Sequence, residues 1–326
     1  MSQFQAIRQS LAPELEQLNA LISDTLRSPN ELMNKVVQHY LEQKGKQIRP
    51  VMVFLSAKLL GTVNENVIRG AVAVELLHNA SLIHDDVVDD TVTRRGAKTI
   101  NGLWDNHLAV LIGDFFLSNS LLLASQTADI RIVDSIGSLG RLLSIGELDE
   151  IYTARYNHPD EENYFNIIYR KTASLFVSCA EVGAYAVGAT DGKQLDALRE
   201  FARLLGLCFQ IKDDIFDYFA DAEIGKPTGN DLREGKITLP LLHVLLTDSS
   251  DCHGEMVELA SRENLNTEEI NRLIRYAVDG GGIEYAETRM RQLHDQATEI
   301  LCANFPASPA RESFISLLDF IITRAL

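Results

Sequence analysis

The chain has 326 residues, of which 46% are hydrophobic and 23% charged, so its composition is that of a folded globular protein and excludes intrinsic disorder. Its 46 acidic and 30 basic residues give a net charge of −16, and the lysines and arginines are scattered singly along the sequence. Such a chain repels nucleic acids and anionic lipid surfaces, so we expect no nucleic-acid partner.

Membrane and export signals are expected to be absent. The apolar stretch 108–112 is interrupted by Gly113-Asp114, and no run approaches the roughly 18 residues of a spanning helix. The first 17 residues contain charged side chains and no continuous apolar segment, unlike a secretory signal. The cysteines form no CxxC pair, which is typical of reduced, buried thiols in the cytoplasm. They are Cys179, Cys208, Cys252 and Cys302.

Apolar residues recur at helical spacing along nearly the whole chain, whereas alternating strand patterns are scarce. The clearest predicted helical stripes are at 67–81 and 201–219. The glycine cluster 280–282 does not follow a strand, which favours a helix-to-helix turn over a phosphate-binding loop. We therefore predict an all-α single domain over 1–326, a bundle of roughly ten or more helices. The predicted breaks, in chain order, are 61–66, 94–101, 158–159, 188–192, 225–235 and 279–282.

Two acidic clusters with the same DDxxD spacing, at 85–89 and 213–217, are the most informative feature. Their first and last aspartates are separated by four residues, so both carboxylates project from one helix face and repel each other. Each cluster continues an apolar stripe, and neither alternates with lysine or arginine as a solvated acidic face does. The repeated pattern therefore favours a functional site over two surface patches.

Carboxylates without neighbouring imidazoles or thiolates select hard cations such as Mg²⁺, whose remaining ligands are commonly substrate phosphates and waters. An EF-hand calcium loop is excluded, because neither cluster has the required glycine and glutamate spacing. Two acidic walls predict a polyanion held between them by metal ions, and a diphosphate fits that description. Basic residues near the clusters or before a helix are candidate diphosphate ligands. They are Lys46, Arg49, Arg94, Arg95, Lys226 and Lys236.

His78 follows Glu75 with the ExxH spacing of a di-iron helical bundle. No other histidine has a glutamate three residues earlier, so the second half of such a site is missing from the sequence. Two interpretations of His78 stay open, a core histidine and a phosphate donor.

Taken together, these stretches resemble the all-trans polyprenyl diphosphate synthases, which elongate isoprenoid chains head to tail. The resemblance extends from about residue 40 to 240. It implies an all-α bundle around a deep central cavity, normally a homodimer, with the two acidic clusters facing each other at its mouth. The matching segments are 45–50, 78–96, Gly113-Asp114, Lys171-Thr172 and 210–240.

The resemblance also implies a role for each matching residue. The magnesium ligands would be Asp85, Asp89 and Asp213, with support from Asp86, Asp214 and Asp217. The allylic diphosphate would contact Arg94, Lys171 and Lys226, assisted by Lys236. Isopentenyl diphosphate would contact Lys46, Arg49, His78 and Arg95. The path of the allylic cation would be lined by Thr172 and Gln210.

The chain departs from the family pattern at two places. One is Gln47, where a basic residue is frequent, and the other is the segment 147–150 (Glu-Leu-Asp-Glu), where the family has a glutamine-rich segment. Neither is part of an acidic cluster, so we expect them to affect fine tuning rather than the reaction. That reaction ionises an allylic diphosphate such as farnesyl diphosphate, and the alkene of isopentenyl diphosphate attacks the cation. A water-excluding helical cavity protects the cation.

Product length is expected to depend on side chains one turn before the first cluster. Ala80 and Ser81 are small there, and Leu77, Phe115 and Phe116 are candidate floor residues further down. Small side chains leave room for a growing tail, so we predict a long product, with a farnesyl or geranylgeranyl diphosphate synthase as the alternative.

Two other classes fit less well. Terpene cyclases usually carry one DDxxD and a mixed second cluster, with no need for a second diphosphate site. Regulatory subunits of two-component prenyl synthases tend to lose the aspartates, and here both clusters are complete.

Overall fold

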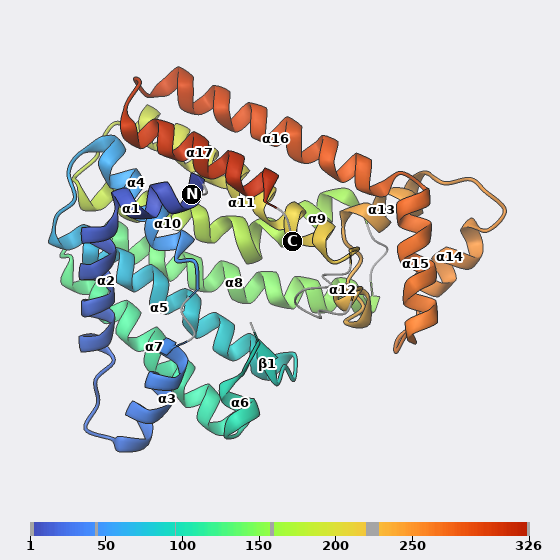
Figure 1. Ribbon diagram of the computed structural model, residues 1–326, viewed down its shortest axis with the longest axis horizontal. Coiled ribbons are helices and arrows are strands. Elements are labelled where there is room, and N and C mark those ends of the chain that lie inside the picture. The colour runs from blue at the N-terminus through green and yellow to red at the C-terminus, as the bar shows by residue number, and fades with distance from the viewer. Residues whose placement is uncertain (1–2, 43–44, 95, 157–159, 220–227, 325–326) are drawn as a thin grey trace. The chain divides into compact units, whose positions relative to one another are not determined.

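A computed structural model (Figure 1) describes residues 3–42, 45–94, 96–156, 160–219 and 228–324. Within these ranges the backbone is helical apart from connecting segments and one antiparallel pair, β1 (Thr93–Arg94) with β2 (Ala97–Lys98). The predicted all-α class is therefore confirmed. Helices α1 to α17 follow one another along the chain.

The chain forms two compact units, each built from three stretches of sequence. Unit 1 comprises Met1–Arg141, Leu175–Arg199 and Leu301–Ser316. Unit 2 comprises Leu142–Ser174, Glu200–Ile300 and Leu317–Leu326. Because the chain passes repeatedly from one unit to the other, the expectation of a single domain over 1–326 remains a prediction.

Unit 1 is built around α5, a helix that is buried on nearly all sides and packs along α7. Asn64 caps its start, accepting a hydrogen bond from the Val67 amide at 3.0 Å. The close approach of α10 to α4 needs a glycine, since a Cβ at Gly183 would lie 2.3 Å from the Val53 carbonyl oxygen. Its helices, whole or in part, are α1 (Gln3–Ser10), α2 (Ala12–Thr25), α3 (Glu31–Glu42), α4 (Ile48–Leu60), α5 (Glu65–Val88), α6 (Ile100–Leu103), α7 (Asn106–Gln126), α8 (Ile130–Tyr156), α10 (Ser174–Ala186), and parts of α11 (Gly192–Phe216), α16 (Gly282–Asn304) and α17 (Pro309–Thr323).

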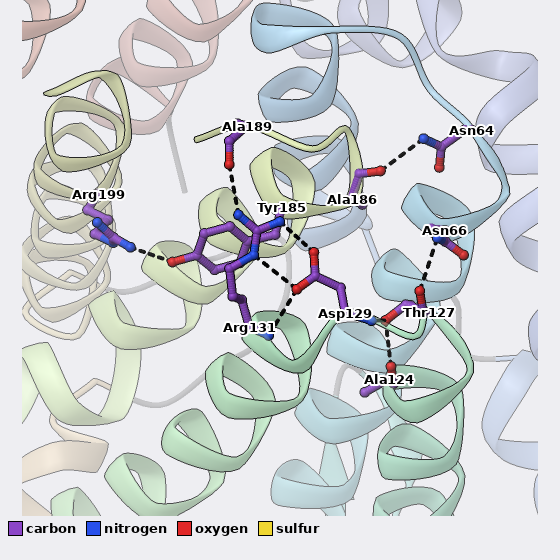
Figure 2. Close-up of polar contacts among 10 residues, drawn as sticks. All are labelled: Asn64, Asn66, Ala124, Thr127, Asp129, Arg131, Tyr185, Ala186, Ala189 and Arg199. Atoms are coloured by element: carbon purple, nitrogen blue, oxygen red, sulfur yellow. Dashed lines mark hydrogen bonds and ion pairs between the residues drawn. The ribbon is translucent and has the colours of Figure 1, made fainter. Parts of the chain in front are cut away.

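A polar network, drawn in Figure 2, joins residues of several helices within unit 1. Arg131, at the start of α8, pairs with Asp129 at 2.6 Å and donates to the Ala189 carbonyl oxygen at 2.9 Å. Its guanidinium carbon lies 4.7 Å from the centre of the Tyr185 ring, whose hydroxyl accepts a hydrogen bond from Arg199. Nearby, Asn64 donates to the Ala186 carbonyl oxygen at 2.9 Å and Asn66 to that of Thr127 at 3.1 Å. These bonds satisfy carbonyl groups at the ends of α10 and α7, so we assign the network a structural role.

Unit 2 holds the second half of α8 and most of the C-terminal helices. The turn at 280–282 joins α15 to α16, as predicted, and a Cβ at Gly282 would lie 2.1 Å from the Pro240 carbonyl oxygen. This glycine therefore serves packing. The elements of unit 2, whole or in part, are α9 (Glu161–Ile168), the π-helical turn η1 (Tyr169–Ala173), α11 (Gly192–Phe216), α12 (Asn230–Arg233), α13 (Leu239–Thr247), α14 (His253–Ala260), α15 (Thr267–Asp279), α16 (Gly282–Asn304) and α17 (Pro309–Thr323).

The structure corrects three expectations. Gly113-Asp114 does not interrupt α7, which by length and composition alone could cross a membrane: its most apolar 18-residue window has mean hydropathy 1.7 and is 39% buried. One such helix is weak evidence, because core helices share these properties. The second predicted stripe ends at Phe216 rather than residue 219. The cysteines are free as expected, but Cys252 and Cys302 are exposed rather than buried.

Candidate active site

The first acidic cluster lies at the C-terminal end of α5, in unit 1. Asp86 is 6% exposed and accepts a hydrogen bond from Nε of Arg94 at 2.8 Å, whereas Asp85 is half-buried and Asp89, the C-cap, is exposed. The carboxyl end of a helix carries partial negative charge, so acidic residues there destabilise it by about 0.3–1 kcal/mol each. A bound cation would remove that penalty.

The second cluster lies at the C-terminal end of α11, in unit 2, and its middle aspartate is also the buried one. Asp214 is 3% exposed and accepts hydrogen bonds from the Tyr164 hydroxyl at 2.5 Å and from Nε2 of Gln210 at 2.8 Å. Burial raises the pKa of Asp214 to about 7, although both hydrogen bonds act in the opposite direction. Thr172 donates to Oε1 of Gln210 at 2.6 Å, which connects two predicted site residues to this carboxylate.

The other two aspartates of this cluster have different partners. Asp213 pairs with Arg324 at 2.6 Å, and the Arg324 guanidinium carbon lies 4.4 Å from the centre of the Phe209 ring. Asp217 accepts backbone hydrogen bonds from Asn230 at 3.1 Å and Asp231 at 3.0 Å, which fastens the start of α12 to the end of α11. Asp217 thus has a clear structural function beside its predicted supporting role.

Lys171 and Lys236 lie in the same ion-pair cluster within unit 2. Lys171, on the π-helical turn η1, contacts Glu147 at 2.7 Å and Glu150 at 2.6 Å. Lys236 contacts Glu150 at 3.0 Å and Glu234 at 2.7 Å. Single π-helical turns within helices are frequent at functional sites.

The pKa values in this cluster follow from burial and pairing together. Burial raises the pKa of Glu150, but Lys171 and Lys236 outweigh it and bring the pKa below its usual value. Burial lowers the pKa values of both lysines, and their carboxylate partners raise them above the usual range. All three groups are therefore charged at neutral pH.

A cavity of about 700 Å³ opens in unit 2 beside these residues. This volume is typical of small-molecule sites. Its polar wall is formed by Glu150, Lys171, Thr172, Gln210, Asp214 and Lys236. Its apolar wall includes Ile167, Ile168, Leu242, Leu245, Leu246 and Val257.

The candidate residues of unit 1 are arranged along α4, α5 and α7. Lys46 is exposed just before α4, and the Arg49 guanidinium carbon lies 5.6 Å from the centre of the Phe176 ring. His78 is 9% exposed on α5, so both interpretations of this histidine remain open. The predicted product-length residues lie on α5 and α7, where Leu77, Ala80 and Phe116 are buried and Ser81 and Phe115 are half-buried.

Part of the expected site stays a prediction. Arg95 and Lys226 lie outside the described residues. The two acidic clusters belong to different units, so their facing each other across a cavity remains a prediction. Among the described residues no three His, Cys, Asp or Glu side chains gather closely enough to form a metal cage. Magnesium is commonly held by one or two carboxylates and substrate phosphates, so the available donors fit that ion.

Sequence reasoning missed three residues of this region. Glu150 had only an indirect signal, the departure from the glutamine-rich pattern at 147–150. Tyr164 and Arg324 had none, because a single tyrosine or arginine far from its partner in sequence is indistinguishable from any other. Their contacts with Asp214 and Asp213 depend on the placement of α9 and of the residue that follows α17.

Comparison with known proteins identifies the family to which the chain belongs. The polyprenyl synthetase family matches residues 30–277. An octaprenyl diphosphate synthase of Haemophilus influenzae is 32% identical over 313 residues, covering 96% of this chain and 94% of that one. A polyprenyl synthase of Caulobacter crescentus, crystallised with calcium and isoprenyl diphosphate, has a TM-score of 0.91 at 31% identity, over 98% of both chains. A geranylgeranyl pyrophosphate synthase of Bacteroides thetaiotaomicron has a TM-score of 0.85 at 36% identity over 100% of both.

Proposed function

Because the chain belongs to the polyprenyl synthetase family and is a prenyltransferase, we propose that it condenses an allylic diphosphate with isopentenyl diphosphate, using magnesium, to give a long all-trans polyprenyl diphosphate. The observation that carries this proposal is the repeated acidic cluster at the carboxyl ends of α5 and α11. In each cluster the middle aspartate is buried and the first is half-buried, so that the first carboxylate has access to a cation.

The metal proposal assigns Asp85, Asp89 and Asp213 as ligands, in line with their greater exposure than Asp86 and Asp214. Bound magnesium supplies Lewis-acid stabilisation of the negative charge that develops on the departing diphosphate. The Caulobacter relative was crystallised with calcium, another oxygen-binding divalent cation, which supports a metal of this class.

The chain's own side chains then stabilise charge and exclude water. The ammonium groups of Lys171 and Lys236 bind the departing diphosphate, and Arg94 adds a further cation from unit 1. Thr172 and Gln210 line the cavity, where their oxygen dipoles stabilise the allylic cation. The isopentenyl alkene attacks that cation, and the proton it loses passes to the released diphosphate. Apolar cavity walls keep water from the cation.

We also propose that the product is long. The octaprenyl relative and the small residue Ala80 favour a long chain, whereas the Bacteroides relative makes a geranylgeranyl product the main alternative. Lys46, Arg49 and His78 remain the proposed ligands of isopentenyl diphosphate.

Assembly and location are also proposals. Apolar side chains on α7 are exposed, among them Leu111 at 61% and Leu122 at 56%, and a second copy of the chain would bury them. We therefore propose a homodimer. The exposed, unpaired thiols of Cys252 and Cys302 support a reducing compartment, the cytoplasm.

The direct test is incubation with farnesyl diphosphate, labelled isopentenyl diphosphate and magnesium, followed by sizing of the products. We expect chain elongation that a chelator abolishes, and a loss of at least about a hundredfold in kcat for Asp85→Asn and for Asp213→Asn. Asp134→Asn, an exposed aspartate on α8 outside the matching segments, is the control. No consumption of isopentenyl diphosphate, with or without metal, would refute the proposal.

A further inference from the structure

Glu150 holds two positive charges on one oxygen atom. Its Oε2 lies 2.6 Å from Nζ of Lys171 and 3.0 Å from Nζ of Lys236, lysines that are 65 positions apart in the chain. All three side chains are at most 24% exposed and line the cavity of unit 2. Two ammonium groups this close repel each other, so their convergence depends on the carboxylate between them.

The backbone around Glu150 is arranged to make this contact. Gly146, one turn earlier on α8, abuts η1 so closely that a Cβ there would lie 2.8 Å from Cγ of Lys171. Ala154, one turn later, lies 3.9 Å from the Cβ position of Gly235, next to Lys236. Residues 146, 150 and 154 share one helix face, which therefore packs against both lysine-bearing segments. Glu150 sits in the middle of that face.

The charge balance at this point disfavours an anion. Glu147 and Glu234 each contact one of the lysines as well, so three carboxylates surround two ammonium groups. A diphosphate that enters the cavity must compete with these carboxylates for the same N–H donors and also meets their repulsion.

We propose that Glu150 is a positioning residue that converges Lys171 and Lys236 on the cavity wall and, by its charge, weakens the binding of the allylic diphosphate. The inference rests on the proposed function for the identity of the ligand. The affinity of this site for diphosphate is then lower than the two lysines would provide without the carboxylate. A lower affinity favours the release of diphosphate-bearing products.

The decisive variant is Glu150→Gln, because the amide oxygen still accepts hydrogen bonds from both lysines while the charge is removed. We expect KM for the allylic diphosphate to fall about three- to tenfold with kcat changed less than about twofold. Glu150→Leu removes the acceptor as well, so the lysines separate and KM should exceed that of Glu150→Gln by at least about threefold. An unchanged or raised KM in Glu150→Gln would overturn the inference.

Asp149→Asn is the matched control, because Asp149 is the neighbouring acid on α8 and pairs with Arg170 instead of with either lysine. Its KM should remain within about twofold of the original value. A general effect of neutralising α8 would lower KM in both variants, and that result would also contradict a specific role of Glu150.

Binding of inorganic diphosphate with magnesium, measured by calorimetry, separates this inference from the proposed function. The intact chain and Glu150→Gln are compared in the same buffer, with no prenyl transfer required. Tighter binding of diphosphate by Glu150→Gln supports the inference even if no elongation is detected. The absence of elongation would count against the proposed function alone. Equal or weaker binding rejects the role of Glu150 whether or not the chain elongates prenyl groups.

Discussion

The hydroxyl of Tyr164 donates a hydrogen bond of 2.5 Å to Oδ2 of Asp214, a carboxylate that is only 3% exposed. Burial raises the pKa of Asp214 from 3.8 to about 7, so the folded state holds its proton more tightly than the unfolded state. This group therefore contributes most to stability below pH 3.8, and its contribution falls as the pH rises towards 7. Tyr164 offsets part of the cost of the charged form.

Tyr164→Phe should lower the free energy of unfolding, and more so at pH 8.5 than at pH 5.5. At pH 8.5 the buried carboxylate is charged and loses a donor, which costs about 1–3 kcal/mol, whereas at pH 5.5 it is protonated and loses less. Urea unfolding in chelator-treated buffer measures both values. Tyr285→Phe, which removes a bond to the more exposed Glu161, should cost less and show little pH dependence. An equal loss at both pH values would contradict this account of Asp214.

Arg324 competes with any cation for Asp213, since its guanidinium is 2.6 Å from that carboxylate. Arg324→Gln should therefore lower the magnesium concentration at half-maximal activity by about two- to fivefold. Arg311→Gln, on α17 and paired with Glu312, should leave it unchanged. Magnesium titrations of initial rates test this, and an unaltered or higher magnesium requirement in Arg324→Gln would show that the ion pair does not oppose metal binding.

Ala80→Phe should shorten the product, because Ala80 is 2% exposed on the face of α5 predicted to border the growing tail. Chromatographic sizing of products from farnesyl and isopentenyl diphosphates measures the effect. Ala80→Leu, with a smaller side chain, should give an intermediate length. Both variants overpack unit 1 by about 1–3 kcal/mol, so unfolding is monitored alongside. An unchanged product distribution in a folded Ala80→Phe protein would exclude this position from the tail site.

Leu111→Glu combined with Leu122→Glu should convert a dimer into monomers. These side chains are 61% and 56% exposed on α7, and a buried unpaired charge in an interface is costly. Analytical ultracentrifugation across a range of protein concentrations reports the change. Glu substitution at Val278, 37% exposed on α15, is the control for an added surface charge. A monomeric starting protein, or dimers that withstand both α7 substitutions, would place any interface elsewhere.

Local patterns in the sequence determined much of this protein. Helical periodicity, the turn at 280–282 and the two DDxxD clusters were all recognisable without coordinates, because each depends on residues within about one or two helical turns. The comparison with known proteins confirmed the family that these patterns indicated.

Packing between distant segments decided which carboxylates are available and what each lysine contacts. The burial of Asp214, the capping of α12 by Asp217 and the convergence of Lys171 and Lys236 on Glu150 all join residues that are far apart in the chain. Such partners depend on how whole helices pack, and nothing in the local spacing of a sequence encodes them. An acidic cluster was therefore predictable, whereas the hydrogen bonds and charges that tune each of its members were not.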